Sequence, residues 1–146
     1  MDRSEVEYQL LLDYLIEVDQ LFPVALSDKV VLGEYAKKLC TKATLCIEKR
    51  ENQYVGVVAG YTENIENGLA YISLVGVRPK YSGKGIASKL IKEFLDVCRS
   101  RHIKKAHVYT DVRNEKAIAM YEKLGFERYY PSNENRPEDV HFIIHI

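Results

Sequence analysis

Hydrophobic positions recur along the chain with periods that change from one segment to the next, and these periods predict its helices and strands. From Ser4 to Gln20 the apolar residues recur at steps of three and four, which predicts an amphipathic helix. The pair Phe22-Pro23 ends this helix. A second helix is expected from Gly33 to Thr41, where Tyr35 and Leu39 share the inward face.

Apolar runs bounded by polar turns predict the strands of a sheet. In chain order the expected strands are Thr44 to Glu48, Tyr54 to Tyr61, Ala70 to Val77, Ala106 to Thr110, Phe126 to Tyr130 and Asp139 to Ile146. A polar turn over residues 50–53 joins the first two strands, and Asn67-Gly68 is a hairpin signal before the third. A polar loop from Pro131 to Pro137 separates the last two.

Two further helices are expected among these strands. The one that follows the third strand buries Ile86, Leu90, Phe94 and Cys98 at helical spacing, and another runs from Lys116 to Leu124. We find no repeat, linker or low-complexity tract that would divide the chain. The pattern therefore predicts one α+β domain over residues 1–146.

The segment between the third strand and the next helix has the features of an anion-binding site. It reads Val77-Arg78-Pro79-Lys80-Tyr81-Ser82-Gly83-Lys84-Gly85-Ile86-Ala87. Backbone N–H groups in the first helical turn lack an intrahelical acceptor, and the helix dipole adds positive charge there. Gly83 and Gly85 have no Cβ, so a phosphate can approach the backbone closely. The segment therefore predicts a site for a pyrophosphate.

Two familiar phosphate motifs do not fit this segment. The Walker A loop needs a lysine after its last glycine, whereas Gly85 is followed by Ile86. The dinucleotide fingerprint needs a third glycine where Ser88 stands, and an acidic residue about 20 positions further on. Lys104 and Lys105 occupy that region instead. What remains is a Gly-x-Gly turn that enters a helix, and such turns also occur without any ligand.

A second motif follows the fourth strand and has the pattern Asn-x-x-Ala-x-x-x-Tyr-x-x-x-Gly-Phe. It is formed by Asn114, Ala117, Tyr121, Gly125 and Phe126. Asn114 can cap the helix, and Gly125 can end it. The two motifs together resemble those of the GNAT superfamily of N-acetyltransferases. The first resembles that superfamily's acetyl-CoA pyrophosphate loop, and the resemblance is strong from about residue 70 to 126.

The resemblance implies a fold and a set of contacts to the co-substrate acetyl-CoA, without a metal. The fold would be α+β in three layers: a mixed, mostly antiparallel sheet with splayed middle strands, two N-terminal helices, a cofactor helix and a later helix. The pantetheine arm would pair with the backbone of Val75, Gly76 and Val77, although a plain bulge would use Gly76 equally well. The amides expected to hold the pyrophosphate are those of Ser82, Gly83, Lys84, Gly85, Ile86 and Ala87. Asn114 would contact the pantetheine or serve only as a helix cap.

The same resemblance implies that Tyr121 is the general acid, donating a proton to the CoA thiolate after direct attack by an amine. An alternative is that Tyr121 is an ordinary core tyrosine. Many family members place a glutamate on the strand before the phosphate loop, but residues 71–77 contain no carboxylate. Asp111, Glu66 and His107 are therefore candidate bases, and a water chain is another possibility. Backbone N–H groups of Val75 or Val77 would stabilise the oxyanion.

The acceptor expected from the sequence is a primary amine of a small molecule, such as an amino sugar or sugar nucleotide. Its pocket would be lined by the first two helices, Tyr109, Asp111 and the loop from Pro131 to Pro137. Acetylation of a protein N-terminus or lysine is the alternative activity. A domain that binds acyl-CoA without transfer is a third hypothesis, because Ser82 stands where the family often has arginine or glutamine. A purely structural domain is a fourth.

The composition of the chain limits the classes of binding partner that we expect. Lys+Arg and Asp+Glu are 21 each, so no net charge favours nucleic acid or anionic membranes. No apolar run approaches the ~20 residues of a membrane span, and the start does not resemble a signal peptide, so we expect a cytoplasmic protein. The three cysteines lack a Cys-x-x-Cys spacing, and the histidines form no metal-ligand pattern. The apolar end, Val140 to Ile144, permits a homodimer or a place inside the monomer's sheet.

Overall fold

The computed structural model describes residues 2–63, 65–131 and 134–146, so two residues of the predicted loop from Pro131 to Pro137 lie outside the described residues. The helices are α1 (Arg3–Val18), α2 (Leu32–Lys42), α3 (Ile86–Ser100) and α4 (Glu115–Lys123). The strands are β1 (Thr44–Arg50), β2 (Gln53–Tyr61), β3 (Leu69–Val77), β4 (Lys105–Asp111), β5 (Glu127–Arg128) and β6 (Asp139–His145). Short 3-10 turns lie at Asp19–Leu21, Leu26–Asp28, Glu66–Gly68 and Pro79–Tyr81.

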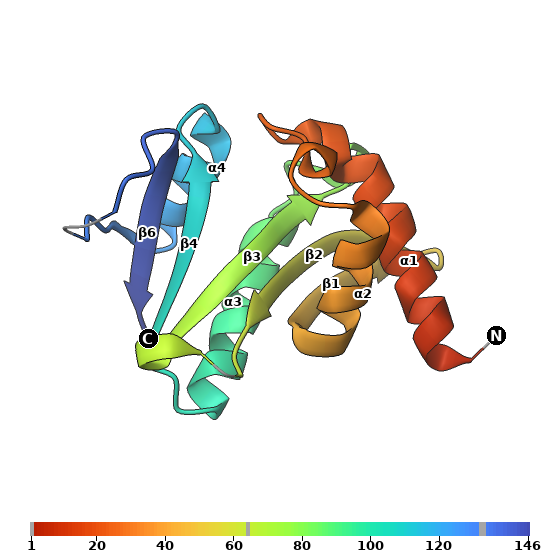
Figure 1. Ribbon diagram of the computed structural model, residues 1–146, viewed down its shortest axis with the longest axis horizontal. Helices are drawn as coiled ribbons and strands as arrows, with labels where there is room; N and C mark the ends of the chain where they lie inside the picture. Colours follow the sequence, from red (N-terminus) through yellow and green to blue (C-terminus); the bar gives the residue numbers. More distant parts are fainter. Residues whose placement is uncertain (1, 64, 132–133) are drawn as a thin grey trace.

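The elements form three layers, as Figure 1 shows. The middle layer is a six-stranded sheet in the order β1-β2-β3-β4-β6-β5. Helices α1 and α2 pack on one face of β2 and β3, and α3 and α4 pack on the opposite face. Neighbouring described strands are antiparallel except for β3 and β4, which are parallel. This arrangement confirms the α+β class and the mixed, mostly antiparallel sheet.

The predicted helices form close to their expected bounds, and local sequence explains their ends. At the start of α1, the side chain of Asp2 accepts a hydrogen bond from the Glu5 N–H at 3.0 Å, which is an N-cap. Helix α1 ends at Val18, two residues before the predicted bound, and continues as a 3-10 turn. Its inward face buries Leu11, Tyr14, Leu15 and Val18.

Both predicted turns between the early strands form. Glu51 and Asn52 link β1 to β2 with φ values of 52° and 63°, the left-handed pair that a tight hairpin requires. Asn67 and Gly68 are also left-handed, with φ values of 57° and 66°. They close a longer connection than a two-residue hairpin, because the chain leaves β2 at Tyr61 and enters β3 at Leu69.

The middle strands separate along their length. β3 and β4 pair from Leu69 with Lys105 to Ile72 with Val108, and no pairing follows although both strands continue. β2 stays paired with β3 as far as Val77. One edge of β3, residues 73–77, is therefore without a strand neighbour. The splay predicted from the resemblance is confirmed.

The late strands complete the sheet within one chain. β5 is shorter than the predicted run from Phe126 to Tyr130, because only Glu127 and Arg128 pair regularly with β6. In β6, Val140, Phe142 and Ile143 are buried against the molecule's own core. These apolar residues are thus covered without a second copy, and the homodimer stays a prediction.

Candidate active site

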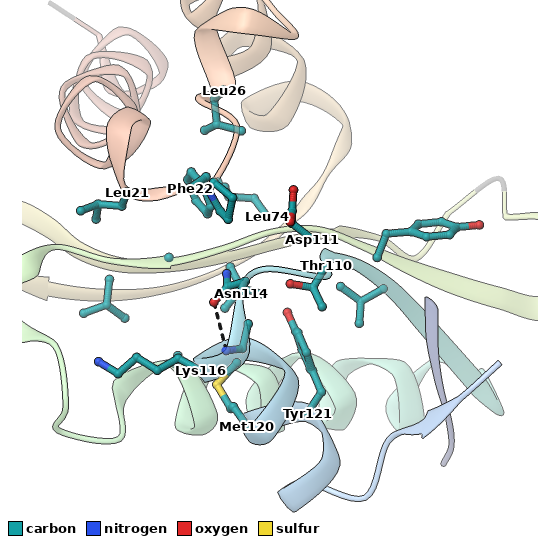
Figure 2. A pocket seen from close by; sticks show the side chains of 18 of the residues that line it. Leu21, Phe22, Leu26, Leu74, Thr110, Asp111, Asn114, Lys116, Met120 and Tyr121 are labelled. Carbon is teal, nitrogen blue, oxygen red and sulfur yellow. Dashed lines mark hydrogen bonds between the residues drawn. The ribbon is translucent and has the colours of Figure 1, made fainter. Parts of the chain in front are cut away.

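A cavity of about 670 Å³ opens where β3 and β4 separate. It brings together residues from both predicted motifs, including Gly83, Gly85, Asn114 and Tyr121. Figure 2 shows its two sides: Phe22 and the other labelled residues of the α1–α2 connection lie on one side of the strands, and the α4 side chains lie on the other. The splay therefore creates one continuous space between the phosphate loop and the far face of the sheet.

The phosphate loop presents a row of unpaired backbone donors to this cavity. None of the described residues accepts a hydrogen bond from the N–H groups of residues 83–88, and the first helical bond at this end runs from Lys89 to the Gly85 carbonyl. Gly83 and Gly85 have φ values of 75° and 77°, with nothing within 4 Å of a Cβ built on either. This open cradle at the start of a long helix suits the negative oxygens of a pyrophosphate.

Side chains around the loop add positive charge. The ammonium groups of Lys80 and Lys84 lie 5.7 and 5.8 Å from the ring centre of Tyr81, and the Arg50 guanidinium lies 5.9 Å from it. Ser82 donates from its hydroxyl to the Pro79 carbonyl at 2.9 Å, so it closes the preceding turn. Three cations therefore flank the loop, although Ser82 itself carries no charge.

The free edge of β3 comes close to α1 at Gly76. A Cβ built on Gly76 would lie 2.6 Å from the Tyr14 hydroxyl, so any side chain there would clash. The Tyr14 hydroxyl is buried and has no hydrogen-bond partner among the described residues. Gly76 is therefore required by packing against α1. Gly76 also lines the cavity, together with Val75 and Val77. Its contact with pantetheine stays a prediction.

Tyr121 lies on α4 and points its hydroxyl into the cavity, toward Thr110 in Figure 2. Its ring packs against Phe126 and Phe142, with centroids 5.3 and 5.5 Å away. No described residue forms a hydrogen bond with this hydroxyl. Burial raises the pKa of Tyr121 above its ordinary value, so the phenol stays protonated at neutral pH. It is a proton donor held on an apolar wall.

Asn114 lies at the mouth of the same cavity and caps α4. Its Oδ1 accepts a hydrogen bond from the Ala117 N–H at 3.2 Å. The capping role that the sequence allowed is therefore present. The cap uses the side-chain oxygen of Asn114 and leaves its amide nitrogen available for another partner. Contact of this nitrogen with pantetheine stays a prediction.

The candidate bases differ in position and in charge state. Two Arg113 nitrogens hold the Asp111 carboxylate at 2.9 and 2.8 Å, and hydrogen bonds from the Arg113 side chain and backbone lower the pKa of Asp111 to about 2. Asp111 is therefore a weak base. Glu66 precedes β3 and so lies at the opposite end of that strand from the splay. It is too far away to meet an acceptor in the cavity.

His107 belongs to a polar cluster that the sequence did not reveal. Its Nδ1 lies 2.8 Å from Nε2 of His141, whose Nδ1 lies 3.2 Å from Glu134. The Tyr109 hydroxyl donates to the same Glu134 carboxylate at 2.6 Å. Burial, reinforced by the nearby His141, lowers the pKa of His107 to about 4. The signal available in the sequence was the alternation of β4 and β6, which sends polar residues to one shared face.

The α1–α2 connection supplies the opposite wall, and a buried acid fixes its course. The Asp19 carboxylate accepts from both the N–H and the hydroxyl of Ser27, each at 2.7 Å. These bonds hold Phe22 and Leu26 against the cavity. The connection between the helices, rather than the helices themselves, therefore lines the cavity together with Tyr109 and Asp111, and their contact with an acceptor stays a prediction.

A splayed sheet, an amide-lined helix start and a buried phenol meet at one cavity. Comparison with protein families identifies the class of protein. The model described as Acetyltransferase (GNAT) family matches residues 8–126. The chain belongs to this family.

Individual relatives match over part of their length. N-alpha-acetyltransferase 30 of Schizosaccharomyces pombe is 42% identical over 59 residues, which are 40% of this chain and 39% of that protein. Mycothiol acetyltransferase of Nocardiopsis dassonvillei is 33% identical over 85 residues, covering 54% of this chain and 25% of that protein. The chain thus spans less than half the length of these relatives.

Among solved structures, the ribosomal-protein-S18-alanine N-acetyltransferase from Escherichia coli has a TM-score of 0.71 and 19% identity. The match covers 100% of this chain and 90% of that one. At this identity the likeness concerns the fold alone. Within the described ranges, no helix has the length and apolarity to cross a membrane, and no cluster of three or more His, Cys, Asp or Glu side chains could hold a metal ion.

Proposed function

We propose that the protein transfers an acetyl group from acetyl-CoA to a primary amine by direct attack of the amine. The observation that carries this proposal is the single cavity shared by the unpaired amides of residues 83–88 and the Tyr121 hydroxyl. The amides suit the pyrophosphate, and the free edge of β3 suits an extended pantetheine arm. Such an arrangement supports a thioester held in the splay, close to Tyr121.

Acetyl-CoA supplies an activated thioester, and the residues of the chain provide the remaining functions. Backbone N–H groups of Val75 and Val77, which alternate with those directed to β2, face the free β3 edge and would stabilise negative charge on the carbonyl oxygen. As the C–S bond breaks, Tyr121 donates its phenolic proton to the departing thiolate, and the proton that the newly acylated nitrogen must lose restores the phenol. The raised pKa of Tyr121 keeps the phenolic proton in place until the thiolate forms. No cysteine lines the cavity, so the residues described there favour direct transfer over an acyl-enzyme.

Two acceptor classes are supported by different observations. The name of the S. pombe relative, N-alpha-acetyltransferase 30, makes a peptide α-amine the first candidate. The name mycothiol acetyltransferase favours the small amine expected from the sequence. Both would enter past Phe22 and Leu26 on one side and Arg136 on the other.

Calorimetric titration with acetyl-CoA, and with CoA alone, is the first test. We expect binding of both in the micromolar range. Release of CoA thiol would then be followed with an alanine-initiated peptide and with glucosamine as acceptors. Absence of acetyl-CoA binding at millimolar concentration would contradict the proposal, and binding without thiol release from any amine would leave only an acyl-CoA-binding domain.

A matched pair of glycine variants ties binding to the loop. Gly85→Ala forces alanine into a left-handed conformation and adds a methyl group in the proposed phosphate cradle. Gly68→Ala imposes the same strain, since φ there is 66° and the surroundings are also open, but it lies at the other end of β3. Each should cost about 1 kcal/mol in stability. Only Gly85→Ala should weaken acetyl-CoA binding.

A further inference from the structure

Behind Tyr109, on the acceptor side of the cavity, lies a carboxylate that comes from a loop instead of from a strand. Glu134 lies between β5 and β6, and its side chain is 19% exposed. One carboxylate oxygen accepts from the Tyr109 hydroxyl at 2.6 Å, and the other lies 3.2 Å from His141 Nδ1. Because Tyr109 lines the cavity, Glu134 is connected to the acceptor space through a single phenol.

Glu134 differs from the other acids near the cavity in its partners. Asp111 is held by Arg113, and Asp139 forms an ion pair with Arg136 at 3.4 Å. Among the described residues, no arginine or lysine forms an ion pair with Glu134. Its carboxylate therefore has a proton donor, the Tyr109 hydroxyl, in place of a fixed positive charge.

The groups around Glu134 also orient it. A carboxylate only accepts, so His141 carries its proton on Nδ1 and leaves Nε2 to accept from His107. The rings of Tyr109 and His141 stack with centroids 4.1 Å apart, and the Arg136 guanidinium lies 3.8 Å from the Tyr109 ring centre. The side chain of Tyr109, which lies on β4, is therefore held in its direction by His141 from β6 and by Glu134 and Arg136 from the loop.

We propose that Glu134 accepts, through the Tyr109 hydroxyl, the proton that the acceptor ammonium must lose before it attacks the thioester. This inference rests on the proposed function and names the base that the strand before the phosphate loop lacks. Tyr109 is the residue that meets the amine. Glu134 acts through it, as a positioning residue that also receives the proton.

The proton transfer balances in one step. An N–H bond of the ammonium breaks, and its electron pair stays on nitrogen as the attacking lone pair. The proton moves to the Tyr109 oxygen while the phenolic proton moves to Glu134. The phenol is regenerated, the carboxylate becomes a neutral acid, and the partly exposed acid returns the proton to solvent.

The charge states of the resting site agree with this direction of transfer. Burial works against the charged form of Glu134, but hydrogen bonds from Tyr109 and His141 prevail and lower its pKa, so the carboxylate is charged at neutral pH. Burial, followed by the hydrogen bond to Glu134, raises the pKa of Tyr109, which therefore keeps its proton. An ammonium that leaves water for the cavity becomes more acidic, which narrows the gap to a carboxylate base.

The test compares Glu134→Gln and Tyr109→Phe with Glu138→Gln, which removes the same charge from an exposed position on the same loop. The kcat/KM is measured against pH with the alanine-initiated peptide or glucosamine, whichever is turned over. At pH 7 we expect at least a tenfold loss in the first two variants and none in the control. The loss should shrink as pH rises, because solution then supplies neutral amine. Glu134→Asp should recover part of the rate.

Hydroxylamine gives a second, independent comparison, because it is largely unprotonated at pH 7 and needs no base. Glu134→Gln should acetylate it as fast as the wild-type protein does. An equal loss at every pH and with both nucleophiles would mean a merely structural role and overturn the inference, as would an unchanged rate. A wild-type protein that acetylates no amine would overturn the proposed function along with it.

A spectroscopic measurement checks the network without turnover. In ¹H–¹⁵N spectra of the histidines, His141 should show a proton on Nδ1 in the wild-type protein without acetyl-CoA. Glu134→Ala should shift the His141 and His107 signals, while Glu138→Gln should leave them in place. Identical histidine signals in wild type and Glu134→Ala would contradict the contact on which the relay depends.

Discussion

At the scale of single residues, Tyr121 differs from Tyr14, whose hydroxyl also lacks a partner among the described residues, because Tyr121 lines the cavity and Tyr14 does not. The Tyr121 ring is buried and packs against Phe126 and Phe142, whereas its hydroxyl faces the cavity and lacks a partner among the described residues. An unpaired hydroxyl on a buried ring is costly unless a ligand or water completes its hydrogen bonding. This observation supports a functional role over that of an ordinary core tyrosine.

Tyr121→Phe tests that role. The substitution removes only the hydroxyl, so the packing against Phe126 and Phe142 should survive and the fold should be unaffected. We expect kcat to fall at least tenfold, because general-acid catalysis typically contributes on the order of 10²–10⁴-fold. Acetyl-CoA affinity, measured by calorimetry, should remain within a factor of two or so. Unchanged turnover would assign Tyr121 to the core.

Asp111 permits a prediction about pH. Its pKa is lowered from 3.8 to about 2 by Arg113, so the ionised carboxylate stabilises the folded protein above pH 3.8. That contribution is lost as pH falls from there through about 2. In Arg113→Ala the carboxyl ¹³C titration midpoint of Asp111 should return toward 3.8. Arg128→Ala, which removes an arginine paired with Glu122, should not move it.

At the scale of elements, α4 depends on its first residue. The helix spans only Glu115–Lys123, so one lost end contact is a large part of its stability. Asn114→Ala should lower the free energy of unfolding by about 1 kcal/mol, because the Ala117 N–H loses its cap. Urea unfolding would measure this loss.

Asn114→Asp separates capping from binding. Aspartate can still cap, so unfolding should be close to that of the wild-type protein. If the Asn114 amide nitrogen also donates to pantetheine, Asn114→Asp should lower the affinity for acetyl-CoA while leaving the free energy of unfolding nearly unchanged. Equal affinity in Asn114→Asp would restrict Asn114 to the cap.

The elements themselves were largely predictable from the sequence, because periodicity is a local property. The bounds of α2 and β2 differ from their predictions by a single residue at each end or less. Glu66 could also have been dismissed, since about 3.3 Å per strand residue places it far from the end of β3. The contact between Tyr109 and Glu134 could not be predicted from the sequence. It joins a strand residue to a loop residue that lies 25 positions further along the chain, and no local pattern near either residue indicates that they meet.

At the scale of the whole molecule, two groups of elements meet along a short seam. Within the part of the chain that the structure describes, four paired positions between β3 and β4 join β1, β2 and β3 to β4, β6 and β5, together with packing on α3 and α4. Acetyl-CoA in the splay would bridge the two groups. Ligand binding and the cohesion of the sheet should therefore be linked.

Thermal unfolding measures this link. Acetyl-CoA at 100 times its Kd should stabilise the protein by about 2.7 kcal/mol and raise Tm by several degrees. In hydrogen exchange, the added protection should concentrate in residues 73–77 and 83–88. A rise in Tm with protection confined to some other region would contradict the placement of the ligand in the splay.

The close approach of Tyr14 to Gly76 has a consequence for how homologous sequences diverge. Residues 14 and 76 are far apart in the chain, yet the Tyr14 hydroxyl oxygen occupies the space that a Cβ at position 76 would need. A drift to alanine at 76 becomes tolerable only after the oxygen at 14 has gone, because the ring carbon beneath it lies at an ordinary 3.7 Å. Lineages with alanine at 76 should therefore carry phenylalanine or a smaller residue at 14, having acquired that change first.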